Sequence, residues 1–338
     1  MFTACVLLAF DNIFNSCFNW QILVTNVGLP SGGDWALQHT GAITLRGSEF
    51  VSVSSCNFER LDGIGVHVSG YNRNTSITDS TFSWLGSSAI ALWGETSTAL
   101  NANGSKVLPE GMRMGPDARE GLQPHHTLIA GNLVREYGLW EKQSSAVFQA
   151  LSQHTTVQGN VFLNAPRAHI NLNDGMGGGD QIVGNLLLNA VRESGDHGPI
   201  NSWDRQPYIT TSRHGSPSVL PLNRTIAYNF ILGTYNSQET VDNDDGSSYY
   251  DTHHNVLAFA DNGLKSNFGG HNNVHRENLY LMVGSCFYGN PCHSCATPSS
   301  YARASFVSNR CVFRNADDLG GYLSDCGKYT QVHLSQWE

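Results

Sequence analysis

Residues 160–187 read NVFLNAPRAHINLNDGMGGGDQIVGNLL, and they contain the pattern that decides the fold. A short unit of Asn followed by apolar residues occurs at Asn160-Val161-Phe162 and returns 25 residues later at Asn185-Leu186-Leu187. Between the two units lies a second apolar run, Ala168–Leu172, followed by Gly and Asn. Short strand-like runs that repeat at a fixed period, separated by turn residues, are typical of a solenoid of stacked β-strands.

The same unit recurs along most of the chain. Its first residue is Asn, or Cys or Ser in the first two cases, at Cys56, Ser80, Asn132, Asn160, Asn185, Asn229, Asn255, Asn278 and Asn309. Most units are 23 to 31 residues apart, and two steps are longer, at 52 and 44 residues. The 52-residue step fits either one coil with a long loop or two coils of which one is degenerate. The rival architectures are a β-sandwich and a β-propeller, whose blades need about 40–45 residues.

The sequence therefore predicts an all-β fold, a single-stranded right-handed parallel β-helix (a solenoid) of roughly ten coils with long loop insertions. Strands of successive coils stack about 4.8 Å apart, so equivalent residues form ladders along the solenoid. We expect hydrogen-bonded Asn side chains in one ladder and Val, Ile, Leu and Phe in the interior.

One domain covers residues 1–338 in this interpretation. Two insertions interrupt the period, residues 94–124 and 196–224, and long loops on a rigid solenoid often form its binding face. The Cys-rich C-terminal end, residues 286–326, is expected to close the last coil through disulfides, because an exposed edge strand invites aggregation. Met1–Phe10 is apolar but no Lys or Arg precedes it, so we expect a truncated N-terminus rather than a signal peptide.

Composition limits the classes of partner. The net charge is −9 and the chain has few Lys, which disfavours nucleic acid. No window approaches the ~18 apolar residues of a membrane span. Eight cysteines, together with N-x-[ST] sequons at Asn74, Asn103 and Asn223, favour a secreted, disulfide-bonded glycoprotein in the extracellular space or the secretory pathway. Free thiols and chance sequons in a cytosolic protein are the alternative.

Acidic residues concentrate in three segments that fall in successive coils. The first contains Asn173-Asp174-Gly175, the second is residues 192–205 (RESGDHGPINSWDR), and the third is Asp242–Asp251. The second segment is notable because only 14% of the chain is charged. Each segment lies between one repeat unit and the next, so we expect all three on one lateral face of the solenoid.

Such a face suits glycoside hydrolysis, which needs one protonated and one ionised carboxyl group beside the scissile bond. Equivalent carboxylates in adjacent coils would be about 5 Å apart, as in retaining enzymes, and two coils apart about 9.6 Å, as in inverting enzymes. Asp196 and Asp244 or Asp245 come from adjacent coils, which favours retention. The catalytic candidates are therefore Asp196, Asp244, Asp245 and His197, the last to orient a carboxylate or bind a hydroxyl.

Polar and aromatic residues near these acids are candidates for substrate binding. Arg205 is suited to bidentate hydrogen bonds with a carboxylate or sugar hydroxyls. Trp203, Trp93 and Trp84 are suited to stack on sugar faces, and packing is the alternative for Trp203. The substrate-binding candidates are Asp174, Trp203, Asp204, Arg205, Asn201, His169 and Asn171. No cofactor is expected; the alternative is calcium at Asp242 and Asp244, because clustered Asp residues before Gly supply oxygen ligands.

The acidic motifs also resemble a known family. The run Glu193–Trp203, preceded by Asn173-Asp174-Gly175 and followed by Asp244-Asp245-Gly246-Ser247, is similar to carbohydrate-active β-helix proteins related to glycoside hydrolase family 141, within the pectate-lyase-like superfamily. The resemblance covers roughly residues 20–330. It implies a retaining or unassigned exo-glycosidase that acts on fucosyl or xylosyl plant or algal polysaccharide. Its motif positions are Asp196, His197, Asp244 and Asp245, and less directly Asp204 and Arg205.

The sequence thus predicts a polysaccharide-acting enzyme, a glycoside hydrolase with paired carboxylates, whose partner is a polysaccharide or oligosaccharide. Two alternatives stay open. A polysaccharide lyase or epimerase needs a base such as Arg or Lys beside a uronate, and usually calcium; the scarcity of Lys counts against it, whereas Arg205 and the Asp cluster keep it open. A carbohydrate-binding solenoid without catalysis is the other.

Overall fold

The computed structural model describes most of the repeat region and several short strands outside it. The described residues are 40–94, 121–173, 178–195, 197–203, 222–234, 239–244, 247–267, 272–290 and 305–313, and the isolated strands β1, β2, β10, β11, β22, β23 and β35 bounded below. No helix occurs among these residues, and so none is long and apolar enough to cross a membrane.

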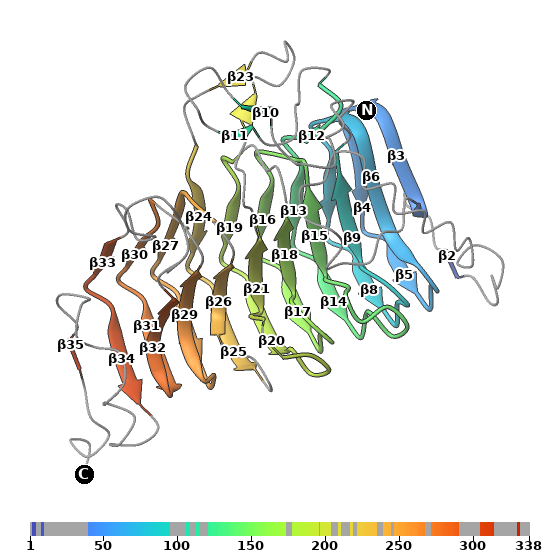
Figure 1. Ribbon diagram of the computed structural model, residues 1–338. Coiled ribbons are helices and arrows are strands. Elements are labelled where there is room, and N and C mark those ends of the chain that lie inside the picture. The colour runs from blue at the N-terminus through green and yellow to red at the C-terminus, as the bar shows by residue number, and fades with distance from the viewer. Residues whose placement is uncertain are drawn as a thin grey trace.

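Three parallel sheets form the walls of a solenoid of about nine coils (Figure 1). Sheet A is β1 (Phe2–Ala4), β4 (Val51–Ser54), β7 (Ser76–Thr78), β13 (Leu128–Ala130), β16 (Thr156–Gln158), β19 (Gln181–Val183), β24 (Arg224–Ala227), β27 (Tyr250–His253), β30 (Val274–Arg276) and β33 (Ser305–Val307). Sheet B is β2 (Leu8–Ala9), β5 (Asn57–Glu59), β8 (Thr81–Ser83), β14 (Leu133–Arg135), β17 (Val161–Leu163), β20 (Leu186–Ala190), β25 (Phe230–Thr234), β28 (Val256–Ala258), β31 (Leu279–Val283), β34 (Arg310–Phe313) and β35 (Thr330–Gln331).

Sheet C completes each coil. It contains β3 (Gly41–Glu49), β12 (Pro124–His125), β6 (Ile64–Arg73), β9 (Ile90–Trp93), β15 (Val147–Ala150), β18 (Ile170–Asn173), β21 (Ile200–Trp203), β26 (Glu239–Asp244), β29 (Asn262–Asn267) and β32 (Ser285–Asn290). Two antiparallel pairs lie outside the sheets, β10 (Lys106–Val107) with β11 (Arg113–Met114) and β22 (Ile209–Thr210) with β23 (Pro217–Ser218). The predicted parallel β-helix is confirmed.

One continuous core fills the solenoid. Every sheet contributes the residues whose side chains point inward, such as Ile182 in sheet A, Leu187 in sheet B and Ile170 in sheet C, and these are buried. In sheet B the aromatic rings of Phe58 and Phe82 stack with centroids 4.4 Å apart. Each such side chain contributes roughly 1.5–3 kcal/mol through burial, so the repeated apolar positions stabilise the coils.

A ladder of Asn side chains runs along the corner between sheets A and B. The amide of Asn185 shows the pattern, because its Nδ2 donates to Asn229 Oδ1 at 3.0 Å and to the Val157 carbonyl at 2.9 Å. Its Oδ1 accepts from the backbone N–H and from Nδ2 of Asn160, both at 3.0 Å. The same bonds join Asn132, Asn160, Asn185, Asn229, Asn255, Asn278 and Asn309. The predicted ladder is confirmed.

The start of the ladder settles the long step in the repeat. The backbone N–H of Ser80 donates to Asn132 Oδ1 at 3.0 Å, and that of Cys56 donates to Ser80 Oγ at 3.0 Å. Ser80 and Asn132 therefore belong to adjacent coils, and the 52-residue step is one coil with a long loop.

Each Asn of the ladder follows a residue whose backbone is left-handed. In three coils this residue is glycine, Gly131, Gly159 and Gly184, with φ of 67°, 62° and 67°. The N–H of Gly159 bonds to the Val183 carbonyl of the next coil at 3.2 Å. A left-handed residue turns the chain sharply and is least strained as Gly, which explains the Gly-Asn pairs of the repeat.

The ladder leads to a test in which the same chemical change is made at two positions of one coil. Asn185→Asp should lower the free energy of unfolding by about 3 kcal/mol or more, because a buried carboxylate replaces two donors by oxygens that face other acceptors. Gln181→Glu is the control, since Gln181 is exposed in β19. Urea unfolding measures both, and equal effects would contradict the ladder as a stabilising element.

Candidate functional site

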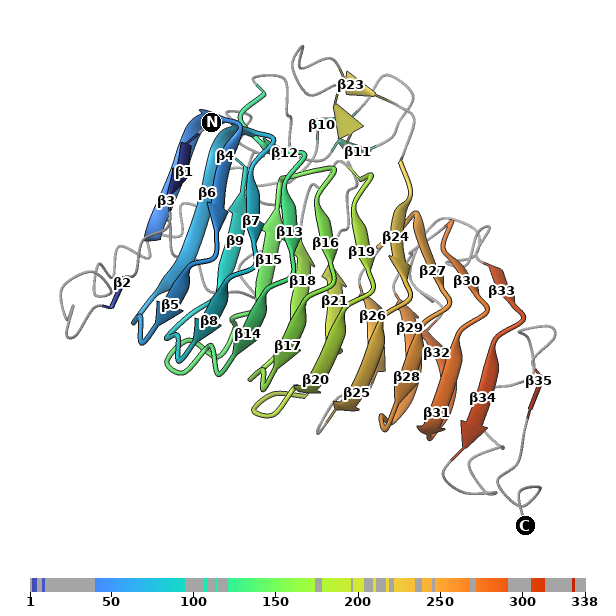
Figure 2. The same cartoon turned by 180° about the vertical axis from the view of Figure 1, so that it is seen from behind.

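The outward face of sheet C carries the segments that the sequence analysis selected. Ile170, Ile200 and Val241 point into the core from β18, β21 and β26, so alternate residues of these strands point the other way. The register stacks them in two columns, Asn171, Asn201 and Asp242, and Asn173, Trp203 and Asp244. We call these six residues the site face. The three strands lie side by side at the middle of the solenoid (Figure 2).

Two amides of the site face, those of Asn171 and Asn201, are buried and bonded to each other. Asn201 Nδ2 donates to Asn171 Oδ1 at 2.8 Å, and both residues have almost no exposed surface. The half-buried Trp203 packs against an aromatic cluster on the same face, in which Trp93 and Phe148 stack with centroids 5.5 Å apart. Trp93 is only 7% exposed. Its ring therefore supports the face through packing and offers no free surface for stacking on a sugar.

His169 lies inside the wall and not in either column. Its Nε2 is 2.9 Å from the Leu188 carbonyl, which can only accept, so Nε2 carries the proton. Its Nδ1 then accepts from the Tyr137 hydroxyl at 2.5 Å. Burial lowers the pKa of His169 to about 3 and raises that of Tyr137 well above its usual value. The neutral His169 thus joins the coil of Tyr137 to the coil of Leu188.

His197 is held by an arginine that the sequence analysis did not select. The Arg167 guanidinium lies 3.2 Å from His197 Nδ1. Because arginine can only donate, Nδ1 accepts, and a neutral His197 carries its proton on Nε2. Arg167 is 2% exposed whereas His197 is half-buried. Arg167 therefore fixes the orientation of the ring at the corner between sheets B and C.

Two carboxylates share the site face on a single strand. Asp242 and Asp244 are two residues apart in β26, which corresponds to about 6.6 Å along a strand. Asp242 is buried and Asp244 is partly exposed. From the sequence, Asp242 is a candidate only as a calcium ligand. Among the residues that the structure describes, no three His, Cys, Asp or Glu side chains are grouped so that they could hold a metal ion.

The register corrects one expectation about Asp196. Asp244 pairs with Trp203, and Trp203 comes seven residues after Asp196 in the sequence. Asp196 and Asp244 are therefore not equivalent in adjacent coils, which was the basis for a separation near 5 Å and for retention. The candidates Asp174, Asp196, Asp204, Arg205 and Asp245 lie outside the described residues and stay predictions.

Serine residues inside the solenoid position the end of β26. The Ser247 hydroxyl lies 2.6 Å from the Asp244 carbonyl, 3.0 Å from the Ser202 carbonyl and 2.9 Å from the Ser202 hydroxyl. The Ser247 N–H also donates to the Asp244 carbonyl at 3.0 Å. The last residue of the Asp-Asp-Gly-Ser motif is thus a structural residue that holds the backbone of Asp244.

Asp180, an acid that follows the Asn173-Asp174-Gly175 segment in the sequence, points inward. Asp180 and Arg224 are each 2% exposed and form an ion pair at 3.4 Å. Asp180 Oδ1 also accepts from the Thr155 N–H at 2.8 Å. Burial raises the pKa of Asp180, an effect that Arg224 opposes. Asp180 therefore belongs to the core and not to the site face.

No protein-family model matches the chain, and no curated protein is similar to it in sequence. A solved structure described as "Glycoside hydrolase" is similar to it with a TM-score of 0.45 and 9% sequence identity. The similarity covers 84% of this chain and 40% of that chain, so this chain spans less than half the length of that protein. The resemblance to glycoside hydrolase family 141 stays a prediction that depends on the motif residues.

The first prediction from the site concerns Ser247. Ser247→Ala should lower the free energy of unfolding by about 1–3 kcal/mol, because the Asp244 and Ser202 carbonyls lose a buried donor. Thr225→Ala, which removes a half-buried hydroxyl from β24, is the control and should change it by less. Thermal or urea unfolding measures both variants. If Ser247→Ala has the same free energy of unfolding as the wild-type protein, this hydroxyl has no structural role.

The second prediction from the site concerns how the free energy of unfolding depends on pH. His169 and His275 are fully buried, and burial lowers the pKa of each from 6.5 to about 3. The unfolded chain therefore binds more protons between these values, and the free energy of unfolding should fall as pH decreases below about 6.5. Each histidine contributes about 1.4 kcal/mol per pH unit to this slope. His169→Gln should make the slope shallower by that amount; an unchanged slope in urea unfolding at several pH values would contradict the buried neutral ring.

Proposed function

We propose that the protein is a polysaccharide-acting enzyme, a glycoside hydrolase whose site face binds the sugar. The observation that carries the proposal is the placement of two carboxylates, Asp242 and Asp244, on one outward face beside Trp203. Their register neighbours, Asn201 and Trp203, supply an amide and an aromatic ring. Carboxylates, amides and an aromatic ring side by side are the groups that a glycosidase uses to bind a sugar and to protonate its linkage.

Asp244 is the centre of the proposed mechanism because it lies on the site face and is partly exposed to solvent. One carboxylic acid donates a proton to the glycosidic oxygen, and a second carboxylate attacks the anomeric carbon or activates a water molecule. Asp244 takes one of these roles. The partner carboxyl group comes from Asp245, from Asp196 in the preceding coil, or from Asp242. His197, with Nε2 protonated, orients a carboxylate or donates to a hydroxyl.

A secreted location is part of the proposal. Asn74 and Asn223, which begin two of the three sequons, are exposed and so accessible to glycosylation. The net charge of −9 and the shortage of Lys suit a substrate that is neutral overall.

Four isosteric variants test the proposal. Asp196→Asn, Asp242→Asn, Asp244→Asn and Asp245→Asn are assayed for release of reducing ends from fucosides, xylans and related polysaccharides. Asp244→Asn and the variant of its partner should each lose a factor of about 10²–10⁴ in kcat/KM. Asp79→Asn is the control, because Asp79 is exposed at another corner and has a φ of 51°, a conformation that Asn also adopts readily. Normal turnover by Asp244→Asn would rule out this mechanism.

A lyase or epimerase is the second candidate, and one observation favours it. Lys265 of β29 pairs in register with Asp242, which puts a basic residue on the strand next to the acidic one. A lyase would abstract the proton beside a uronate carboxylate and release an unsaturated product that absorbs in the ultraviolet. If the wild-type protein forms this absorbing product and Lys265→Ala does not, the reaction is elimination and not hydrolysis. Binding of polysaccharide without either product would instead identify a binding protein.

A further inference from the structure

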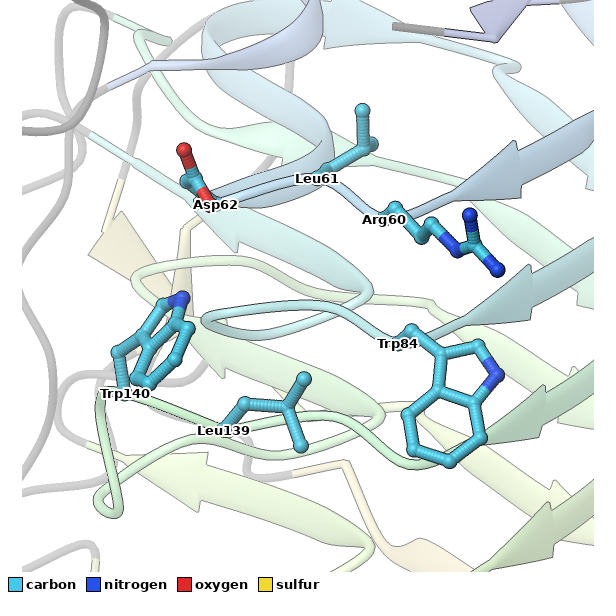
Figure 3. A pocket seen from close by; sticks show the side chains of 6 residues that line it. All are labelled: Arg60, Leu61, Asp62, Trp84, Leu139 and Trp140. Carbon is cyan, nitrogen blue, oxygen red and sulfur yellow. The ribbon is translucent and has the colours of Figure 1, made fainter. Parts of the chain in front are cut away.

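A cleft of about 420 Å³ opens on the corner between sheets B and C, in the N-terminal coils (Figure 3). The indole rings of Trp84 and Trp140 lie on either side of Leu139 in this view. The side chains of Arg60, Leu61 and Asp62 lie above them. Its lining is Arg60, Leu61, Asp62, Trp84, Leu139 and Trp140. We call it the tryptophan cleft. It belongs to three successive coils, because its residues follow β5, β8 and β14.

Backbone hydrogen bonds between these coils build the cleft. The Gly86 N–H donates to the Leu61 carbonyl at 2.7 Å, and the Trp140 N–H donates to the Gly86 carbonyl at 3.1 Å. A Cβ at Gly86 would lie 2.0 Å from the Asp62 carbonyl oxygen and 2.5 Å from the Trp140 ring. Only glycine fits there, so the close stacking of the three loops depends on this residue.

The aromatic surface of the cleft faces solvent. Trp140 is 71% exposed and Trp84 is 45% exposed, although large apolar side chains are usually covered. Two exposed indoles that line the same concave site mark a binding surface more than a packing defect. Tryptophan combines a large apolar face with a polar N–H, which suits a ligand that has both apolar and polar faces.

The charged groups at the rim indicate which ligand this is. Arg60 Nε lies 3.8 Å from Glu59 Oε1, and Asp62 adds a second carboxylate. One cation beside two carboxylates would repel a polyanion, but it offers donors and acceptors for hydroxyl groups. A pyranose ring has an apolar C–H face for the indoles and hydroxyls at its edge. The chemistry therefore fits an uncharged sugar.

We propose that the tryptophan cleft is a binding subsite for a neutral polysaccharide chain, separate from the site face. The next corners between sheets B and C carry Arg167 and then His197, so His197 lies two coils beyond Trp140, or about 10 Å along the axis. A polysaccharide that runs parallel to the solenoid axis along this edge reaches both. Only one part of the inference rests on the proposed function, namely that the polymer bound in the cleft is also the one cleaved at the site face. Sugar binding in the cleft does not require catalysis.

The experiment measures polymer binding by affinity electrophoresis and calorimetry with xylan and xyloglucan, and with polygalacturonate as the charged polymer. Trp84→Ala and Trp140→Ala should each weaken binding to a neutral polymer by about tenfold, which corresponds to about 1.4 kcal/mol, whereas Trp140→Phe keeps most of the affinity. Phe50→Ala is the matched control, because Phe50 is 61% exposed and has a φ of 57°, close to the 59° of Trp84. Trp140→Ala keeps the test decisive if Trp84→Ala does not fold.

The outcomes separate this inference from the proposed function. If the wild-type protein binds a neutral polymer through both indoles but releases no product, the cleft stands and the hydrolase proposal falls. If the variants bind as the wild-type protein does, or if only polygalacturonate binds, the subsite is overturned. It is also overturned if sedimentation shows that the two Trp→Ala variants dissociate a dimer while polymer binding is unchanged, since the cleft would then hold a second copy of the chain.

Discussion

The hydrogen-bonded Asn ladder is the constraint on which the rest of the structure depends. Each interior Asn of the ladder uses both amide protons and accepts two bonds, so every coil is tied to the next at one fixed point. The corner that contains the ladder has a constant length. Two residues separate the strands of sheets A and B in each coil, from Ser55-Cys56 to Ser308-Asn309. An insertion there would break a buried chain of hydrogen bonds, which is costly because each amide left unsatisfied loses its compensation for desolvation.

Variation in length is therefore confined to the other two corners. Between sheets B and C the connection is four residues after β5, but eleven after β14 and nine after β20. The long insertions follow β9 and β21, on the way from sheet C to sheet A. The tryptophan cleft and His197 lie at the first of these corners, and Trp203 and Asp244 lie at the start of the second. A rigid corner and two variable corners thus divide the coil into a part that fixes register and a part that carries chemistry.

The fold could be predicted because its signal repeats. An Asn that recurs in the same local context, mostly at steps of 23 to 31 residues, reports both the period and the bond that enforces it. The ladder contains the residues that the sequence indicated. The site could be predicted only in part. Repeat spacing shows which coil a residue belongs to, but not its position along the strand. A second pattern in the sequence indicates that position, because each strand begins with Ile or Val and its residues then alternate between the core and the outward face. The three strands are Ile170-Asn171-Leu172-Asn173, Ile200-Asn201-Ser202-Trp203 and Val241-Asp242-Asn243-Asp244. Alignment of these strands pairs Asp244 with Trp203, as the register does.

The tryptophan cleft had no such signal, and the reason is physical. Its residues come from corners of different lengths, so Trp84 and Trp140 are not equivalent positions of the repeat and no periodicity connects them. Their proximity depends on Gly86, whose lack of a side chain lets one loop approach the next. In a solenoid of this kind, features that recur in every coil can be predicted from the sequence. Features formed by loops of unequal length can be found only from how neighbouring loops pack in the structure. Binding surfaces belong mainly to the second group, because an irregular ligand cannot be matched by a surface that repeats in every coil.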